Sequence, residues 1–553
     1  MIAKYLKIVS LFTMSFLAAA LISSCESSPE EQIPPFSDHY TQYVETLSSD
    51  NFEGRAPTTS GGRKTKAYIE SEFRRMGLQP ALGNSYRQPV PLVEIEGSNF
   101  SNIEITGDAD QPLSFSYADE MIVGTSRLQD RVELHDSELV FAGFGIVAPE
   151  YEWDDYQGLD VEGKTVVVFV NDPGYHTLDP DFFTGKAMTY YGRWTYKYEE
   201  AARQGAEGVL IVHETGPAGY GWDVVKNSWS GPQYDVGGDN GEPTVLMEGW
   251  LHNSAAHILF EQAGFTLDEL REEALKPDFQ PFSMEMNASV NFDVRYEESE
   301  SANIAGFVEG SQRPEETVVY MAHWDHLGKV ETDEGVDIYN GAIDNATGTA
   351  AIMVIAEKFA NMEPAPERTV LFLAVTAEES GLIGSRYYAM NPLFPLETTA
   401  GGINIDGLNV YGPTHDVSVV GYNFSDIQDY LERHAREQGR VLVPESKPER
   451  GYFYRSDHFN FVREGVPMIY ANSGNDFIDR DDAYAEWAQE DQELRYHSPL
   501  DIIHDGWDWQ GLDQNLWLFF NVGHDLANSN HWPQWREGTE FEPIRQESAH
   551  LRE

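Results

Sequence analysis

The sequence predicts an α/β protein in which helices flank a twisted, mixed β-sheet, with a second, smaller domain, α/β or rich in strands, inserted into the first. Two observations carry this prediction. From residue 300 onward, short apolar runs rich in β-branched residues alternate with longer segments of helical periodicity, as in buried parallel strands covered by helices. Between residues 131 and 294, a second alternation of strand and helix interrupts the chain.

Five strands and four helices are expected in the second half of the chain. The strand candidates are 317–322, 368–375, 401–405, 416–420 and 466–471. The helix candidates are 346–362, 381–390, 424–439 and 509–527. Near the N-terminus, Ile69, Phe73 and Met76 form an apolar stripe of helical spacing, which Gly77 ends.

The chain of 553 residues is long enough for two or three domains, at roughly 150 residues each. We assign residues 37–130 and 295–530 to the main domain, residues 131–294 to the insertion and residues 531–553 to a C-terminal tail. Within the insertion we expect strands in 138–147, 163–174 and 206–216, a helix in 195–205, and a glycine-rich loop from Thr215 to Gly241.

The N-terminus predicts a lipoprotein signal. Lys4 and Lys7 precede an apolar stretch from Ile8 to Ile22, which is followed by small residues and Cys25. We expect residues 1–24 to be removed as a signal peptide, Cys25 to be lipidated, and residues 25–36 to act as a tether at a bacterial cell envelope. A transmembrane helix is the alternative, but the apolar stretch is shorter than the roughly 20 residues that a span needs.

Composition limits the classes of partner. The formal net charge is −55, which repels nucleic acid and anionic lipid and suits a salty medium. Hydrophobic residues make up 41% of the chain, enough to build cores. Since Cys25 is the single cysteine, no internal disulfide forms and no other thiol serves catalysis or metal binding.

Six acidic and imidazole side chains predict a two-metal hydrolytic site. Most of them lie at or just beyond an apolar run, and ligands in open α/β sheets collect outside the carboxyl ends of strands. Each context alone has a structural alternative, since Asp or Asn before a helix is usually a cap and paired glutamates usually start a solvated helix. Their conjunction favours a metal site. The six residues are His323, Asp344, Glu378, Glu379, Asp406 and His497.

These residue types suit zinc, with Co²⁺ or Mn²⁺ as substitutes. Histidine nitrogens and carboxylate oxygens are zinc ligands, and a shared carboxylate holds two ions roughly 3.5–4 Å apart. Three carboxylate ligands and a bridging hydroxide would balance the charge of two divalent ions. One glutamate of the adjacent pair then stays off the metals, where it can act as general base.

Five segments hold these residues, in the order AHWDHLG, GAIDNATG, AVTAEESG, GGINIDG and RYHSPLD. In this order they resemble the co-catalytic di-zinc aminopeptidase family, which includes bacterial aminopeptidase S and relatives of glutamate carboxypeptidase and the transferrin receptor. The resemblance implies the zinc exopeptidase fold, and implies that the insertion is a protease-associated domain. It also implies that His323 and Asp406 hold one zinc ion, that Glu379 and His497 hold the other, and that Asp344 bridges them.

The resemblance assigns three further roles. Glu378 would be the general base, Asp325 would orient the first histidine ligand, and Tyr496 would help to hold the oxyanion of the tetrahedral intermediate. Trp324 stands where a tyrosine is more usual and His326 follows Asp325; we expect neither change to touch a ligand.

Two segments have candidate roles in substrate binding. Asp457 and His458 lie at an expected helix start and match a family motif near the substrate pocket, although a helix cap is an equal alternative for this motif. The acidic segment 475–495 is a candidate wall of a specificity pocket, with a solvated acidic loop as the alternative. The histidines at 415, 434, 504, 524 and 531 have no such context.

The predicted protein is a di-zinc exopeptidase that removes N-terminal amino acids from peptides. Its expected partners are peptide substrates and, through the lipid anchor only, a membrane; nucleic acid is excluded, and no oligomeric state is predicted. A carboxypeptidase or dipeptidase on the same scaffold is an alternative, for which Arg450, Arg455 and Arg495 are candidate carboxylate holders. The branch that cyclises N-terminal glutamine uses one metal ion, and the complete ligand set disfavours it. A non-catalytic surface lipoprotein is disfavoured for the same reason.

Overall fold

The computed structural model describes residues 33–552, apart from 108–110, 238–241 and 333–334. The predicted signal peptide, Cys25 and most of the predicted tether lie outside the described residues. Phe36–Glu553 forms one compact unit. Within the described ranges, no helix combines the length and the apolarity that crossing a membrane requires.

The predicted strands form the centre of a mixed sheet. Strands β14 (Arg313–His323), β17 (Arg368–Val375), β18 (Thr399–Asn404) and β21 (Met468–Ser473) run parallel in the order β17–β14–β18–β21. On the far side of β21, β19 (Asp416–Val420) pairs antiparallel. Further pairings extend the sheet to 17 strands among the described residues. The predicted fold class and all five predicted strands are therefore confirmed.

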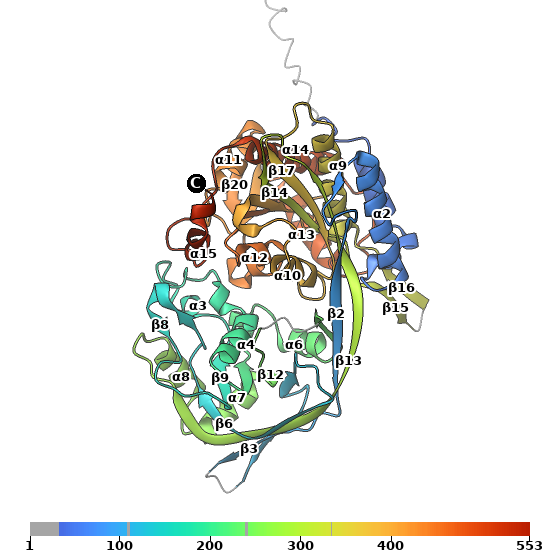
Figure 1. Ribbon diagram of the computed structural model, residues 1–553. Helices are drawn as coiled ribbons and strands as arrows, with labels where there is room; N and C mark the ends of the chain where they lie inside the picture. Colours follow the sequence, from blue (N-terminus) through green and yellow to red (C-terminus); the bar gives the residue numbers. More distant parts are fainter. Residues whose placement is uncertain (1–32, 108–110, 238–241, 333–334, 553) are drawn as a thin grey trace, which may run out of the picture. The chain divides into compact units, whose positions relative to one another are not determined.

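Helices cover both faces of this sheet because its strands are apolar on both sides. Along β14, Val318 and Tyr320 pack with α9 (Gly348–Ala360) and α14 (Trp509–Asn528). The alternate residues of β14 pack in a second cluster with α10 (Ile383–Met390) and α12 (His458–Val462). Figure 1 shows these helices against the sheet. Three of the four predicted helices are α9, α10 and α14, and the fourth is α11 (Gln428–Glu437).

The N-terminal helix ends where the sequence predicts. Helix α2 (Ser60–Met76) buries Ile69, Phe73 and Met76, and Gly77 follows with a φ of 82°. This left-handed conformation lets the Gly77 amide reach back to close the last turn, and glycine adopts it without a steric penalty.

The chain enters and leaves the insertion along one antiparallel pair. Strand β2 (Arg87–Ser98) pairs with β13 (Phe282–Val308) from Arg87 opposite Ile304 to Ser98 opposite Asp293. Figure 1 shows β13 as one long strand that reaches the central sheet. The predicted boundary between residues 294 and 295 falls inside this strand, and the domain limits stay predictions.

The insertion has its own parallel strands and hydrophobic clusters. Strands β6 (Arg131–Phe141), β9 (Thr165–Phe169), β10 (Gly208–Val212) and β12 (Met247–Leu251) run side by side, and α4 (Trp194–Arg203) precedes β10. Side chains from these elements form two buried clusters separate from those of the central sheet. The strand and helix predictions for the insertion are confirmed.

Two segments contain more regular structure than their composition favours. The expected loop from Thr215 to Gly241 contains α5 (Thr215–Ala218), α6 (Trp222–Trp229) and β11 (Gln233–Val236), and the acidic segment 475–495, for which a solvated loop was the alternative, contains α13 (Asp482–Arg495). In α6, Val225 is buried and the two tryptophans pack beside it. In α13, the side chain of Asp481 caps the helix by accepting from the amide of Tyr484 at 3.0 Å. Local capping and packing outweigh a composition that favours loops.

The predicted C-terminal tail is packed against the main domain. Trp535 and Phe541 are buried in the cluster that covers the α10 and α12 face of the sheet. Arg545 of α15 (Glu542–Glu547) is fully buried and donates to the carbonyl of Thr399 at 3.0 Å.

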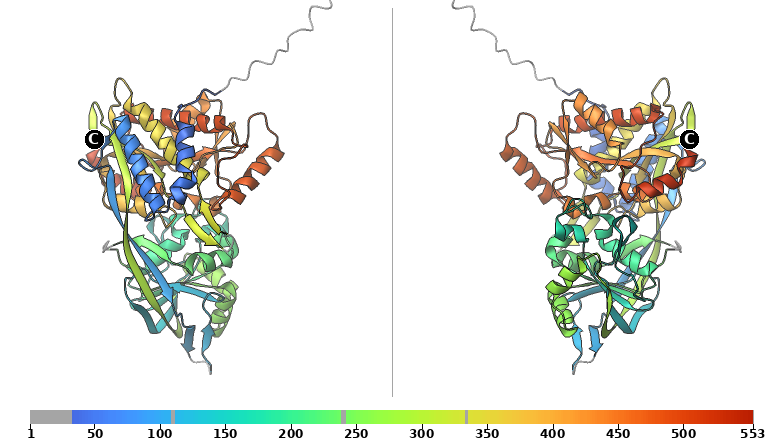
Figure 2. Two further views of the ribbon diagram at one scale, coloured as in Figure 1. Left: turned by 90° about the vertical axis from the view of Figure 1, so that its right-hand side faces the viewer. Right: turned by 90° about the vertical axis from the view of Figure 1, so that its left-hand side faces the viewer.

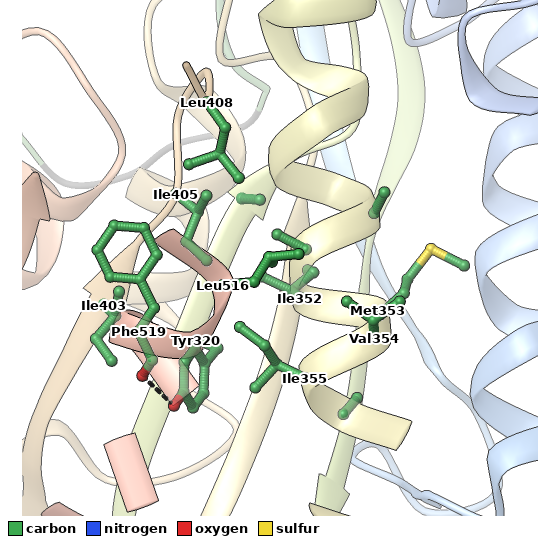
Figure 3. Close-up of a cluster of buried hydrophobic side chains, with 14 of the residues drawn as sticks. Tyr320, Ile352, Met353, Val354, Ile355, Ile403, Ile405, Leu408, Leu516 and Phe519 are labelled. Atoms are coloured by element: carbon green, nitrogen blue, oxygen red, sulfur yellow. Dashed lines mark hydrogen bonds between the residues drawn. The ribbon is translucent and has the colours of Figure 1, made fainter. Parts of the chain in front are cut away.

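The contact between β14 and α14 gives a test of the core. Figure 3 shows Tyr320 between α9 and α14, with its hydroxyl donating to the carbonyl of Phe519 at 2.8 Å. A Cβ atom at Gly523 would lie 1.8 Å from the Tyr320 hydroxyl.

We therefore expect Gly523→Ala to lower the free energy of unfolding by about 1–3 kcal/mol, because overpacking outweighs the roughly 1 kcal/mol that alanine gains in a helix. Urea denaturation measures the change. Gly231→Ala is the matched control, since nothing lies within 4 Å of its added methyl group. Equal stability of the two variants would contradict the packing described here.

Candidate metal centre

Four of the six predicted residues lie at one edge of the sheet because they end or follow parallel strands that finish level with one another, whereas Asp344 lies in the segment before α9 and His497 follows α13. His323 is the last residue of β14, and it lies beside Val375, the last residue of β17. Asn404, the end of β18, lies beside Met321, so that Asp406 comes level with His323. The glutamate pair follows β17 by three and four residues.

Asp344 occupies the middle of the site. Its Oδ1 atom lies 3.2 Å from Nε2 of His323, and its Oδ2 atom lies 3.2 Å from Nε2 of His497. The remaining partners flank it: Nε2 of His323 is 3.1 Å from Oδ1 of Asp406, and Nε2 of His497 is 3.0 Å from Oε2 of Glu379. The two histidines therefore face opposite oxygens of one carboxylate.

These distances fit ligands that share a tetrahedral ion. Two atoms bound to zinc at about 2.0–2.1 Å lie about 3.3 Å apart when their angle at the metal is tetrahedral. The four pairs lie 3.0–3.2 Å apart. Ligand atoms of His323, Asp344 and Asp406 also lie within 4.8 Å of one another, as a group that could hold a metal ion. The donor set and its spacing fit zinc.

The clustered carboxylates of the site favour the binding of cations. Burial lowers the pKa of His497, but its contacts with Asp344 and Glu379 hold that pKa at about 10. Burial, together with the carboxylates of Asp406 and Glu379, raises the pKa of Glu378 well above its usual value. Metal ions would displace the protons that these groups retain in the metal-free protein.

The two adjacent glutamates differ in their contacts. Glu379 directs Oε2 toward His497. In the described part of the chain, the Glu378 carboxylate has no hydrogen bond or ion pair. Its oxygen lies within 4.8 Å of ligand atoms of His323 and Glu379. A carboxylate without a fixed partner at this position is free to exchange a proton with a bound molecule.

Asp325 is placed differently from the expectation. Nδ1 of His323 lies 3.2 Å from the backbone carbonyl of Asp325 and 4.0 Å from its carboxylate. The carboxylate instead accepts from the amide of Glu378 at 3.2 Å. Asp325 therefore orients the histidine through its main chain, and its side chain fixes the start of the glutamate pair.

His326 contradicts the expectation that it touches no ligand. Its Nδ1 atom lies 2.5 Å from Oε1 of Glu379. His326 is only three residues from His323, so its proximity to the site could have been predicted. Apolar periodicity, however, does not predict that its side chain points toward Glu379.

Several supporting residues have no role in the sequence predictions. Ser456 donates to Oδ2 of Asp406 at 2.6 Å. Asp501 accepts from the amides of Ile343 and Asp344 at 2.9 and 3.0 Å, which holds the loop of the shared carboxylate. Asn345 donates to the carbonyl of Ile405 at 2.9 Å and thereby links that loop to the one that carries Asp406.

Arg55 is the most extensively bonded of these supports. Its buried guanidinium donates to the carbonyls of Leu47, Trp324, Asn340 and Gly341 at 2.5–2.9 Å. Burial lowers its pKa to about 10, so it stays charged at neutral pH.

Tyr496 lies beside the site. Its ring stacks on that of His497, with centroids 3.9 Å apart and planes 19° apart, and the residue is 57% exposed. Partial desolvation of the phenol and the nearby carboxylates, Asp344 first among them, raise the pKa of this group. The group therefore stays protonated and able to donate a hydrogen bond.

Asp457 and His458 are fully buried, so they offer no surface to a peptide in this structure. Asp457 accepts from the hydroxyl of Ser385 at 2.5 Å. The ring of His458 lies 4.9 Å from those of Phe453 and Tyr470, and among the described residues neither of its nitrogens has a hydrogen-bond partner. The burial favours a supporting position, and substrate contact stays a prediction.

The candidate wall of a specificity pocket is the polar helix α13. Of its residues, Ala488 is buried, and Figure 2 shows the orange-red helix standing away from the sheet. Arg495 at its end is engaged by Asp491 at 2.7 Å and by the carbonyl of Leu500 at 2.6 Å. Arg450 donates to the hydroxyl of Tyr452 at 3.2 Å, and the exposed Arg455 lies over the same ring.

Comparisons with known proteins found one family model and several relatives that match parts of this chain. The sequence profile described as Peptidase family M28 matches residues 303–522. Aminopeptidase NAALADL1 of Rattus norvegicus is 26% identical over 299 residues, which are 46% of this chain and 37% of that protein. Leupeptin-inactivating enzyme 1 of Streptomyces exfoliatus is 27% identical over 182 residues, which are 32% of this chain and 39% of that protein. The chain thus spans under two-fifths of the length of each of these relatives.

Two solved structures resemble the chain over most of its length. An aminopeptidase from Aneurinibacillus sp. strain AM-1 is 17% identical with a TM-score of 0.47, covering 89% of this chain and 94% of that one. A zinc aminopeptidase from Bacillus subtilis is 16% identical with a TM-score of 0.41, covering 90% and 97%.

The burial of His458 gives a prediction of pH dependence. Burial lowers the pKa of this imidazole to about 3, whereas an unfolded histidine titrates near 6.5. Between these values the unfolded chain binds a proton that the folded protein does not, so stability falls as the pH drops from about 6.5 toward 3. The whole window corresponds to about 4–5 kcal/mol.

His458→Phe keeps the ring contacts. We expect its free energy of unfolding to rise relative to that of the parent by about 1.4 kcal/mol for each pH unit below 6.5. Urea denaturation of both proteins at pH 8 and pH 5 in the presence of a chelator measures this without a contribution from metal loss. A difference between the two proteins that does not change with pH would show that the imidazole charges normally in the folded state.

Proposed function

Residues 303–522 belong to peptidase family M28, and from this premise we propose that the protein is a zinc-dependent aminopeptidase that removes residues from the N-terminus of peptides. The observation that carries the proposal is the position of Asp344, whose two oxygens face the two ligand histidines at 3.2 Å each. A carboxylate placed in this way suits two ions better than one.

In the proposed assignment, His323 and Asp406 hold one zinc ion, Glu379 and His497 hold the second, and Asp344 bridges them. The pair distances of 3.0–3.2 Å support this division. When bound, the zinc ions would polarise the scissile carbonyl and lower the pKa of the attacking water.

Glu378 is the proposed general base and acid. Its carboxylate lies within ligand range of His323 and Glu379 and has no fixed partner among the described residues. It would take a proton from the attacking water and deliver that proton to the leaving amine.

Tyr496 is the proposed oxyanion donor. Its stacking on His497 holds the ring beside the metal centre, and its raised pKa keeps the proton on the phenol. A donor in this position would stabilise the negative charge that develops on the carbonyl oxygen.

A carboxypeptidase or dipeptidase is the second candidate. The exposed Arg455 is next in sequence to Ser456, whose hydroxyl donates to Asp406. A basic side chain is therefore one residue away from a contact of the proposed metal centre. One assay separates the candidates: free and N-acetylated aminoacyl anilides, and dipeptides with free and blocked C-termini, each with and without chelator. An aminopeptidase would hydrolyse free but not N-acetylated anilides, and dipeptides with either C-terminus. A carboxypeptidase or dipeptidase would require the free C-terminus, and the absence of any chelator-sensitive hydrolysis would refute the enzyme.

Replacing each of the two glutamates by glutamine tests their roles. Glu378→Gln should keep both zinc ions and lose about 10²–10⁴-fold in kcat, because it removes the proton acceptor and no ligand. Glu379→Gln is the matched control, and it should lose zinc. Metal analysis alongside kinetics measures both properties. The reverse pattern of zinc loss would mean that the two roles are exchanged.

The bridging role of Asp344 is tested by removing its charge. Asp344→Asn should weaken the binding of both ions and lower activity, with excess zinc restoring activity in part, while the fold survives on its apolar sheet. Asp501→Asn, which keeps an oxygen acceptor for the same loop, is the control. Parent zinc affinity and parent kcat in Asp344→Asn would rule out the two-metal assignment.

A further inference from the structure

His326 lies inside the metal centre without being one of the expected ligands. The residue is 1% exposed, and its Nδ1 atom is 2.5 Å from Oε1 of Glu379. The other oxygen of this carboxylate, Oε2, faces His497 at 3.0 Å. The two oxygens of Glu379 therefore have different histidine partners.

Distance separates the two kinds of contact. Ligands of one tetrahedral zinc ion lie about 3.3 Å apart, and the four proposed ligand pairs lie 3.0–3.2 Å apart. His326, Asp344 and Glu379 offer ligand atoms within 4.8 Å of one another, as a group that could hold a metal ion, but at 2.5 Å the contact of His326 with Glu379 is shorter than the spacing of two ligands on one tetrahedral ion. The short contact is that of a charge-assisted hydrogen bond from an imidazole N–H to a carboxylate.

The surroundings hold the His326 ring in this orientation. A Cβ atom at Gly341 would lie 2.6 Å from Cγ and Cδ2 of the ring, so the absence of a side chain there makes room for it. The carbonyl of Gly341 is held in turn by Arg55 at 2.8 Å. On another side, the ring of His497 lies 5.8 Å away at 70°.

The second ring nitrogen makes no competing contact. Nε2 of His326 is buried and has no hydrogen-bond partner in the part of the chain that the structure describes. The contact with Glu379 is therefore the one hydrogen bond of the ring among those residues, and it places the proton on Nδ1.

We propose that His326 is a positioning residue that donates its Nδ1 proton to Oε1 of Glu379 and so directs Oε2 to the zinc ion shared with His497. The inference rests on the proposed two-zinc function. Hydrogen bonds from such supporting groups raise metal affinity by about 10–100-fold, because they fix the carboxylate in its binding orientation.

Three variants test the proposal. Asparagine carries an amide nitrogen at the position of Nδ1, so His326→Asn can keep the donor, whereas His326→Leu removes it and fills similar space. The matched control is His434→Leu on α11, which breaks a buried histidine contact with Asp525 at 2.9 Å away from the metal centre.

Zinc titration against a chromophoric chelator measures the affinity of each ion, and the spectrum of the cobalt-substituted protein reports the ligand set. We expect His326→Leu to bind its weaker ion 10–100-fold less tightly with an unchanged spectrum at saturation, and His326→Asn and His434→Leu to stay within about threefold of the parent. Thermal unfolding of the metal-free variants controls for misfolding.

Two results would overturn the proposal. Parent affinity in His326→Leu would show that the hydrogen bond does not serve the metal. A changed cobalt spectrum in both His326 variants would show that the imidazole is itself a ligand. The parent protein provides the separate check on the proposed function, since fewer than two bound zinc ions in the parent would refute the two-metal site rather than the role of His326.

Discussion

The geometry of the candidate metal centre depends on one buried guanidinium. Arg55 donates to four backbone carbonyls, of Leu47 before α2, of Trp324 beside His323, and of Asn340 and Gly341 at the entrance to the loop of Asp344. These carbonyls belong to three segments that are far apart in the sequence. Since a buried carbonyl without a donor costs about 1–3 kcal/mol, the arginine both satisfies the loops and fixes their spacing. The positive charge also lies among carboxylates, where it offsets part of their repulsion.

The sheet supplies the second constraint. Its parallel strands end level with one another, so loops that follow β14, β17 and β18 meet at one edge. Both faces of these strands are covered by helices, and the packing of side chains such as Tyr320 with α9 and α14 keeps the strand ends fixed (Figure 3). Burial of each large apolar side chain contributes roughly 1.5–3 kcal/mol, and none of that depends on the metal. The acidic edge is therefore supported by an apolar body, which tolerates the repulsion among buried carboxylates.

Hydrogen bonds around the site give chemically similar residues different functions. Glu379 has a partner for each oxygen, whereas Glu378 has none for its side chain among the described residues. The first is thereby held in place, and the second is available for proton transfer. His323, His326 and His497 lie close together, yet His323 and His497 face the carboxylate of Asp344 at 3.2 Å, whereas His326 contacts Glu379 at 2.5 Å. Residue type alone does not make these distinctions.

The sequence by itself determined the fold class, the five strands and four helices predicted in the second half of the chain, and the six residues that the structure brings together. Apolar periodicity and the order of polar residues after each run carry this information, because burial and strand direction act locally. The tertiary structure alone decided the helices α6 and α13, the orientation of His323 by the main chain of Asp325, and the contact between His326 and Glu379. The helices depend on capping and packing, and the orientation of His323 depends on the position of a carbonyl. The contact of His326 depends on the space left by Gly341 and on a glutamate 53 residues away, and apolar periodicity does not reveal such contacts.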